Sequence, residues 1–214
     1  MKGEQIRLIE TNTQVRSLFV LAEILRHISG EIPMFILEEE MLNWSTKEEV
    51  VNSKYKTSQG KLTENGQKTK AFKHYIKLAE KLELIFLIGQ TIQLTKFGEL
   101  FCLIFPEKGN RENLFFWYWL LKYDSDNLLT IWKILMDNQQ GLKEIQIRQQ
   151  FGKEFKERLF KKMQNIASNG NFDIESIIRS MQIETEMGNS HTQKHLVPPR
   201  LAWLNELNIC TSGG

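Results

Sequence analysis

The stretch from Ile85 to Phe101 constrains the fold more than any other part of this chain, because its pattern changes abruptly along its length. Two short apolar runs, Ile85–Ile88 and Thr91–Leu94, are separated only by Gly89-Gln90, which predicts two antiparallel strands joined by a tight turn. The chain then passes directly into Thr95-Lys96-Phe97-Gly98-Glu99, where a threonine in the N-cap position indicates the start of a helix. We therefore predict a hairpin followed at once by a helix.

Three helices are predicted before this hairpin. Apolar residues spaced by three and four predict an amphipathic helix over Thr13–Ser29, with Gly30 at its C-terminal end. A second, short helix is expected over Phe35–Trp44, followed by a polar insertion over Ser45–Gly66. The third helix is expected over Thr69–Leu84. Few prolines and abundant helix-forming residues agree with a mainly helical protein.

Helix, helix, basic helix, hairpin and a Leu-Thr-x-x-Gly helix entry follow one another in this order. The order resembles that of the winged-helix superfamily, and Leu94-Thr95 with Gly98 match the end of its wing. The resemblance covers about residues 13–104 and departs from the pattern in the insertion before the third helix. It implies that the third helix lies in the major groove of duplex DNA. It also leaves open a role as a protein–protein adaptor, since winged helices often serve in that way.

The second half of the chain is predicted to repeat this plan incompletely. A helical connector over Glu112–Tyr123 carries five consecutive aromatic residues, which we interpret as a buried hub, and Asp124-Ser125-Asp126 starts a new helix over Asn127–Met136. Further helices are expected over the following ranges: Gly141–Phe151, the basic segment Gly152–Ala167, and the amphipathic segment Asp173–Met187.

The last predicted helix, Pro198–Cys210, resembles the third helix of a second winged unit. Its prolines are expected at the helix start, and Glu206–Cys210 repeats the apolar pattern of Lys81–Ile85. The sequence stops at Gly214, where a second wing would begin, so either the native chain continues or the second unit lacks its wing. The fold class is thus mainly α with small β-hairpin wings, in tandem winged-helix-like units joined by a helical connector. We expect one unit with a basic insertion over 1–108, and the connector with an incomplete unit over 109–214.

Positive charge is concentrated in two segments, although the formal net charge is only +2. Asn43–Lys77 contains eight lysines and three glutamates, and Leu142–Met163 contains five lysines and two arginines against three glutamates. The remainder of the chain is therefore acidic. Such clustering is typical of proteins that bind polyanions, although it also fits two solvated helical faces.

The third helix is the preferred binding site. Lys70, Lys73, Lys77 and Lys81 share one face, opposite Phe72, Ile76 and Ala79. Like charges at this spacing repel one another, so a polyanion or acids from another element should balance them. Lysines would hold phosphates, while His74, Gln67 and Thr69 could reach base edges. The candidate DNA-binding residues are Lys56, Lys61, Lys68, Lys70, Lys73, His74, Lys77, Lys153, Lys156, Lys161, Lys162 and Arg200.

Motifs of catalysis and metal binding are not evident in the sequence. It has no Gly-x-x-x-x-Gly-Lys phosphate loop, no Gly-x-Ser-x-Gly elbow and no dinucleotide fingerprint. His191 and His195 have the spacing of half a zinc site, but two exposed loop histidines are the preferred interpretation. Glu38-Glu39-Glu40 is interpreted as a solvated face. We expect neither an enzyme nor a bound metal or cofactor.

The longest apolar run, Leu114–Leu121, is too short to cross a bilayer, and the N-terminus has no signal-peptide core. We therefore expect a cytoplasmic protein with reduced, buried Cys102 and Cys210. The first functional hypothesis is a duplex-DNA-binding protein, or the DNA-recognition part of a larger prokaryotic or phage restriction, defence or mobile-element protein. The second is a scaffold subunit that binds protein, and the third is a positioning domain for an enzyme located downstream.

Overall fold

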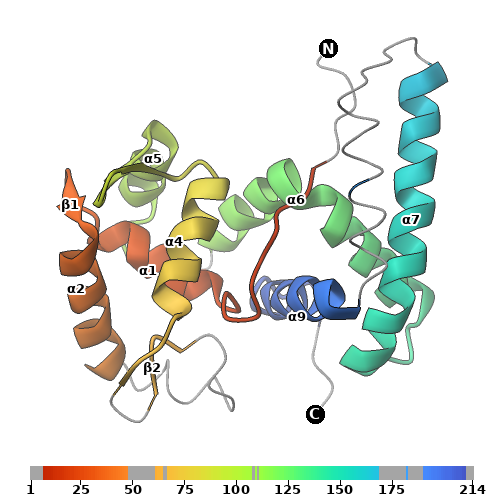
Figure 1. Cartoon of the computed structure of the whole chain (residues 1–214), viewed down its shortest axis with the longest axis horizontal. Helices are drawn as coiled ribbons and strands as arrows, with labels where there is room; N and C mark the ends of the chain where they lie inside the picture. Colours follow the sequence, from red (N-terminus) through yellow and green to blue (C-terminus); the bar gives the residue numbers. More distant parts are fainter. Residues whose placement is uncertain are drawn as a thin grey trace.

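The computed structural model describes residues 7–47, 61–64, 67–107, 109, 111–168, 182 and 190–210. They form a mainly helical protein with a small antiparallel sheet (Figure 1). The elements of the first half are α1 (Leu18–His27), β1 (Ile32–Pro33), α2 (Met34–Lys47), β2 (Thr63–Glu64), β3 (Gln67–Lys68), α4 (Ala71–Lys81), β4 (Ile85–Ile88), β5 (Thr91–Leu94) and α5 (Lys96–Ile104). The second half contains α6 (Glu112–Asp137), α7 (Glu144–Ser168) and α9 (Ser190–Glu206).

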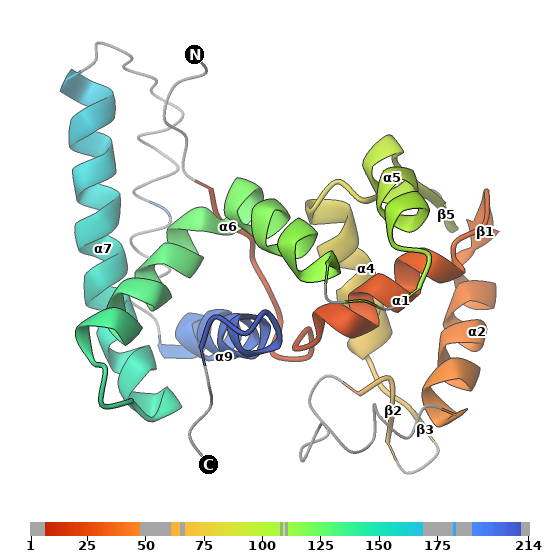
Figure 2. The same ribbon diagram turned by 180° about the vertical axis from the view of Figure 1, so that it is seen from behind.

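The predicted hairpin is confirmed residue by residue. β4 and β5 pair antiparallel, with Ile85 opposite Leu94 and Ile88 opposite Thr91, and Gly89 adopts the positive φ of 63° that the turn requires. The short strand β1 pairs with β5, so the strand order is β1-β5-β4. Because β1 lies between α1 and α2, this pairing holds both helices beside the hairpin (Figure 2).

The helix boundaries follow local capping. α1 begins at Leu18, later than the pattern predicts, because the Ser17 side chain accepts a hydrogen bond from the Val20 amide. It ends at His27, with Ile28 as the C-cap, so Gly30 lies beyond the cap, in the turn before β1. The predicted N-cap of α5 is confirmed, since the Thr95 side chain accepts a hydrogen bond from the Gly98 amide.

The predicted polar insertion is partly structured. Its beginning continues α2 as far as Lys47, and its end forms a second hairpin in which Thr63–Glu64 pairs with Gln67–Lys68. Residues 48–60 lie outside the described part of the chain. The second hairpin leads directly into α4.

The second half differs from the prediction at several points. A single helix, α7, replaces the two helices expected over 141–167. Pro198 and Pro199 lie inside α9 rather than at its start. The predicted helix over 173–187 lies outside the described residues apart from Gln182. Among the residues described after 108 there is no strand, so a second winged unit stays a prediction.

The break in α6 is confirmed at Asp124, where φ and ψ depart from helical values. Its aromatic hub is only partly buried: Phe116 and Trp119 lie in the core, whereas Tyr118 is exposed. Full burial was the wrong expectation for Tyr118, because the helix has one face in contact with the protein and another in solvent.

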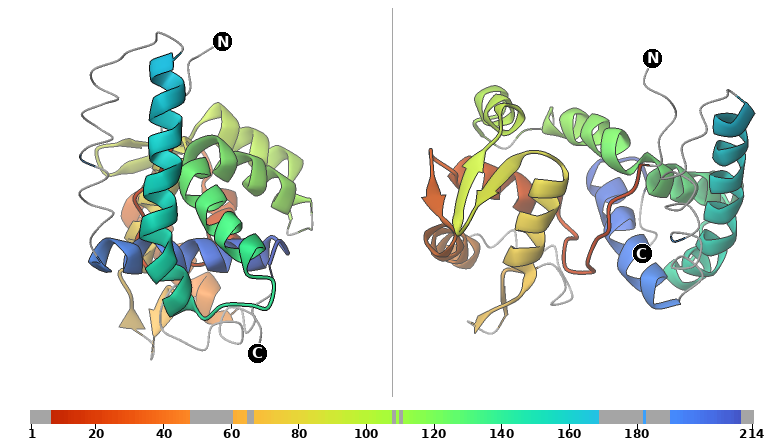
Figure 3. Two further views of the ribbon diagram at one scale, coloured as in Figure 1. Left: turned by 90° about the vertical axis from the view of Figure 1, so that its right-hand side faces the viewer. Right: turned by 45° about the horizontal axis from the view of Figure 1, so that its top comes forward.

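One continuous apolar core includes residues from both halves. α6 extends from the sheet-containing half to α7 and α9 (Figure 3). The N-terminal segment 7–15 runs between the two halves and contacts α6 and α9. The two ends of the described chain thus contribute to the same packed interior.

Candidate nucleic-acid interface

An open depression of about 400 Å³ lies where α2, β3 and α4 meet. We call it the basic depression. It is lined by Glu38, Lys68, Thr69, Lys70, Lys73, His74 and Lys77. Five of the predicted DNA-binding residues are therefore brought together at one place.

Thr69 fixes the geometry of this site. Its amide donates to the Leu62 carbonyl at 2.9 Å, and its hydroxyl donates to the Lys61 carbonyl at 2.6 Å. The same hydroxyl accepts a hydrogen bond from the Ala71 amide at 3.1 Å, at the first turn of α4. The second hairpin is thereby tied to the helix, and Lys68 on β3 is held beside the lysines of α4.

The positive charge of the depression is only partly neutralised. Lys68 Nζ lies 3.2 Å from Glu38 Oε2. Lys70, Lys73 and Lys77 are exposed, and none of them has an ion pair with any residue that the structure describes. Three ammonium groups without an ion-pair partner among the described residues, at the N-cap and in the first two turns of α4, make a favourable environment for an anion.

His74 lies among these lysines and is half-buried. Burial lowers the pKa of its imidazole below the ordinary value, and the neighbouring Lys77 contributes in the same direction. The ring is therefore neutral at pH 7, so it offers one hydrogen-bond donor and one acceptor to a ligand.

Other predicted residues of this region do not line the depression. Lys81 Nζ instead donates to the Glu10 carbonyl at 3.2 Å. Lys61 is half-buried, and its carbonyl accepts the Thr69 hydrogen bond. Lys56 lies outside the described residues. The four-lysine face predicted from the sequence is thus shortened to Lys70, Lys73 and Lys77, with Lys68 added from β3.

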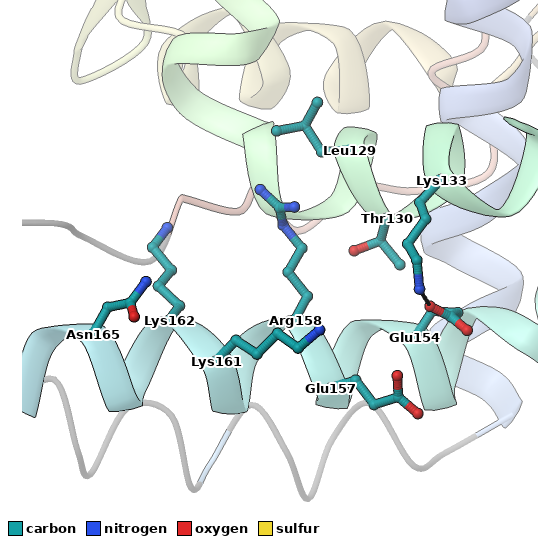
Figure 4. A pocket seen from close by; sticks show the side chains of 9 residues that line it. All are labelled: Leu129, Thr130, Lys133, Glu154, Glu157, Arg158, Lys161, Lys162 and Asn165. Carbon is teal, nitrogen blue, oxygen red and sulfur yellow. Dashed lines mark hydrogen bonds and ion pairs between the residues drawn. The ribbon is translucent and has the colours of Figure 1, made fainter.

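The second basic segment forms a depression of about 240 Å³ between α6 and α7 (Figure 4). Here the cations already have acidic partners. Lys162 Nζ lies 2.8 Å from Asp126 Oδ2, and Arg158 Nε lies 3.4 Å from Asp126 Oδ1. Lys153 pairs with Glu157 at 3.9 Å. Lys156 and Lys161 are exposed on the same helix. Because most of its charge is balanced, this segment is the weaker of the two candidates.

The prediction that Arg200 contacts DNA is wrong. Its side chain is fully buried and forms an ion pair with the equally buried Asp124, with Nε 2.6 Å from Oδ2. Its remaining N–H groups donate to Thr11, Leu196, Ile9 and the second oxygen of Asp124. All five donors of the guanidinium are used inside the protein, so Arg200 is a structural residue.

The described residues hold no group of three metal-ligating side chains. His195 is half-buried on α9 rather than in an exposed loop, because α9 begins earlier than predicted. Cys102 and Cys210 are free and half-buried, and burial raises the pKa of both thiols. None of the described helices has the length and apolarity needed to cross a membrane.

Sequence reasoning missed Glu38, which it assigned to a solvated acidic face. The structure places this carboxylate at the edge of the basic depression, 3.2 Å from Lys68. Helical or strand spacing could not predict this contact, because Glu38 lies on α2 and Lys68 lies on a strand thirty positions later. No protein-family model matches the chain, and no curated protein or solved structure matches it either.

Proposed function

We propose that this chain binds duplex DNA through the basic depression. The observation that carries the proposal is that Lys70, Lys73 and Lys77 are exposed around His74 and have no ion pair with any described residue. We further propose that residues 13–104 form a winged-helix unit. The order α1-β1-α2-β2-β3-α4-β4-β5, in which β2 and β3 form the second hairpin, and the sheet order β1-β5-β4 support this assignment.

Electrostatic repulsion provides the physical argument. Lysines three and four residues apart on a helix destabilise it by a few tenths of a kcal/mol per pair. Acids of neighbouring elements would relieve this repulsion if the face were an internal salt-bridge network, as they do for Lys162. For Lys70, Lys73 and Lys77 no described residue does so. A phosphate backbone supplies the missing negative charge.

The wing contributes little to this mode of binding. Its outward residues on β4, Phe86 and Ile88, are apolar and exposed, and the turn carries Gly89-Gln90. We therefore assign phosphate contacts to α4 and β3, with His74 as the side chain that could reach a base edge. We propose no catalytic role for the chain.

The test replaces Lys70, Lys73 and Lys77 together by alanine. Binding to a fluorescent random-sequence duplex is measured by anisotropy over a series of salt concentrations. We expect weaker binding, and a plot of log K against log salt that is shallower by about 0.9 for each phosphate that the variant no longer neutralises. The fold should be retained or slightly stabilised, since alanine is the best helix former, and circular dichroism checks this.

The matched control replaces Lys153, Lys156 and Lys161, which removes the same charge from the exposed face of α7. It should change binding much less than the α4 triple variant. Wild-type affinity in the folded α4 variant would reject the basic depression as the site. A wild-type chain that binds neither duplex nor single-stranded nucleic acid at low salt would reject the function.

A scaffold role is the second candidate function, and one feature of the surface supports it. Large apolar side chains are exposed on β4, α5 and the first half of α6. Such surfaces are typical of sites that bind protein. Association through them would persist at high salt, whereas DNA binding would not.

A further inference from the structure

A row of apolar side chains is exposed along α5 and the adjacent part of α6. We call it the α5–α6 stripe. Its members, with the exposed fraction of each, are Phe97 (43%), Leu100 (44%), Leu103 (79%), Ile104 (54%), Leu114 (73%) and Tyr118 (65%). They recur at intervals of three and four along each helix, so each helix presents a continuous apolar edge to solvent.

The two helices contact each other through aromatic side chains. The Phe101 ring packs against Phe115 with centroids 5.0 Å apart, and the Phe97 ring against Trp119 at 4.9 Å. Lys122 Nζ lies 5.1 Å from the centre of the Phe97 ring. Phe101 and Phe116 fill the core beneath. The inward-facing side chains of α5 and α6 are therefore already packed in the core. The exposed side chains of the α5–α6 stripe are not part of that packing.

The stripe has the size of a protein interface. At about 200 Å² for a large apolar residue, its exposed fractions correspond to roughly 700 Å² of surface. Soluble monomers rarely expose apolar patches larger than a few hundred Å². A stable interface buries about 800 Å² on each partner. One protein surface of equal size would therefore cover the stripe.

The charges around the stripe indicate which protein supplies the covering surface. Exposed residues of both signs lie at its two ends: Lys96 and Glu99 near the start of α5, and Glu107 and Arg111 after its end. In a two-fold arrangement whose axis is perpendicular to α5, the start of α5 in one copy faces the end of α5 in the other. Lys96 then meets Glu107 of the second copy, and the two helix dipoles run antiparallel. The charged residues around the stripe of one copy are therefore complementary to those of a second copy.

We infer that the α5–α6 stripe is the interface of a symmetric homodimer. It contains none of the residues of the basic depression, so dimerisation leaves that site uncovered. The inference does not depend on the proposed function, because the dimer forms without DNA.

The test measures the mass of the full chain by sedimentation equilibrium in the absence of nucleic acid. We expect twice the monomer mass of 25.2 kDa at micromolar concentration. Replacing Leu103 and Leu114 together by glutamate should return the mass to that of the monomer, because four charges would enter the apolar interface. Both positions are solvent-exposed, and circular dichroism verifies that the fold survives.

The control is Phe160→Glu, which places one glutamate on an apolar residue outside the stripe, 64% exposed on α7. It should remain dimeric. Lys96→Glu should weaken the dimer at least severalfold, and adding Glu107→Lys should restore it. A monomeric wild-type chain would overturn the inference and assign the stripe to a different protein. A dimer that survives the Leu103 and Leu114 substitutions would place the interface elsewhere.

Discussion

The Arg200 side chain donates five hydrogen bonds inside the protein. Its guanidinium is fully buried, and its partners come from the N-terminal segment, the α6 break and α9 itself. Asp124 accepts further hydrogen bonds from the Ile9 amide at 2.8 Å and from Asn127 at 2.7 Å. A buried charge is tolerated only when its partners are complete in this way.

Replacing Arg200 by alanine should therefore lower the free energy of unfolding by about 3–5 kcal/mol, since Asp124 would be left buried and unpaired. Arg200→Lys should also destabilise the protein, because an ammonium has three donors where five are used. Urea denaturation followed by tryptophan fluorescence measures both effects. A variant at Arg158, which is 39% exposed, serves as the control and should change stability by under about 1 kcal/mol. If Arg200→Ala lowered the free energy of unfolding by as little as the Arg158 variant, the buried ion pair with Asp124 would not be important for stability.

At the scale of elements, the contact between α5 and the residues before β4 explains the Leu-Thr-x-x-Gly pattern. The Thr95 amide donates to the Leu84 carbonyl at 3.0 Å, and the Thr95 hydroxyl donates to the Glu83 carbonyl at 2.7 Å. This brings the first turn of α5 so close that a Cβ at Gly98 would lie 2.2 Å from the Leu84 oxygen. Only glycine fits without moving the backbone.

Gly98→Ala should consequently destabilise the protein by about 1–3 kcal/mol, as overpacking against backbone does, despite the better helix propensity of alanine. Thermal unfolding monitored by circular dichroism measures the change. Gly109→Ala is the control, because nothing lies within 4 Å of the added carbon and the residue is exposed. If the two variants unfolded at the same temperature, the close approach at Gly98 would not matter energetically.

At the scale of the whole molecule, the far end of the described chain closes onto its beginning. Glu206, at the end of α9, accepts hydrogen bonds from the Ser17 hydroxyl at 2.8 Å and the Leu18 amide at 2.6 Å. Its carboxylate thus caps α1 across 188 residues. Trp203 donates to the Val15 carbonyl at 2.8 Å beside it. These contacts and the continuous core join the two halves.

Glu206→Ala should lower the free energy of unfolding by about 2 kcal/mol, the contribution expected of hydrogen bonds to a charged group. Tryptophan fluorescence and far-ultraviolet circular dichroism should still report one coincident transition, because the core remains shared. Glu80→Ala, at an exposed position of α4, should be nearly neutral. Two separate transitions in the wild-type chain would show that the halves unfold independently.

The basic depression was only partly predictable. Lys70, Lys73 and Lys77 share a face because they are three and four residues apart on a helix, and this spacing can be read from the sequence. Lys68 lies beside them because a second hairpin, which begins inside the predicted polar insertion, ends next to α4. Arg200 was misassigned because its type and position give no sign of Asp124, which lies 76 residues away.

The sequence by itself determined the elements with strong local signals. The β4–β5 hairpin, the Thr95 cap, the break at Asp124 and the apolar face of α4 depend on turn chemistry, capping and helical period. These act between residues a few positions apart. Tertiary structure decided the continuous α7, the prolines inside α9 and the pairing of the buried charges of Arg200 and Asp124. Burial sets the energy of those features, and burial depends on which distant segments pack together.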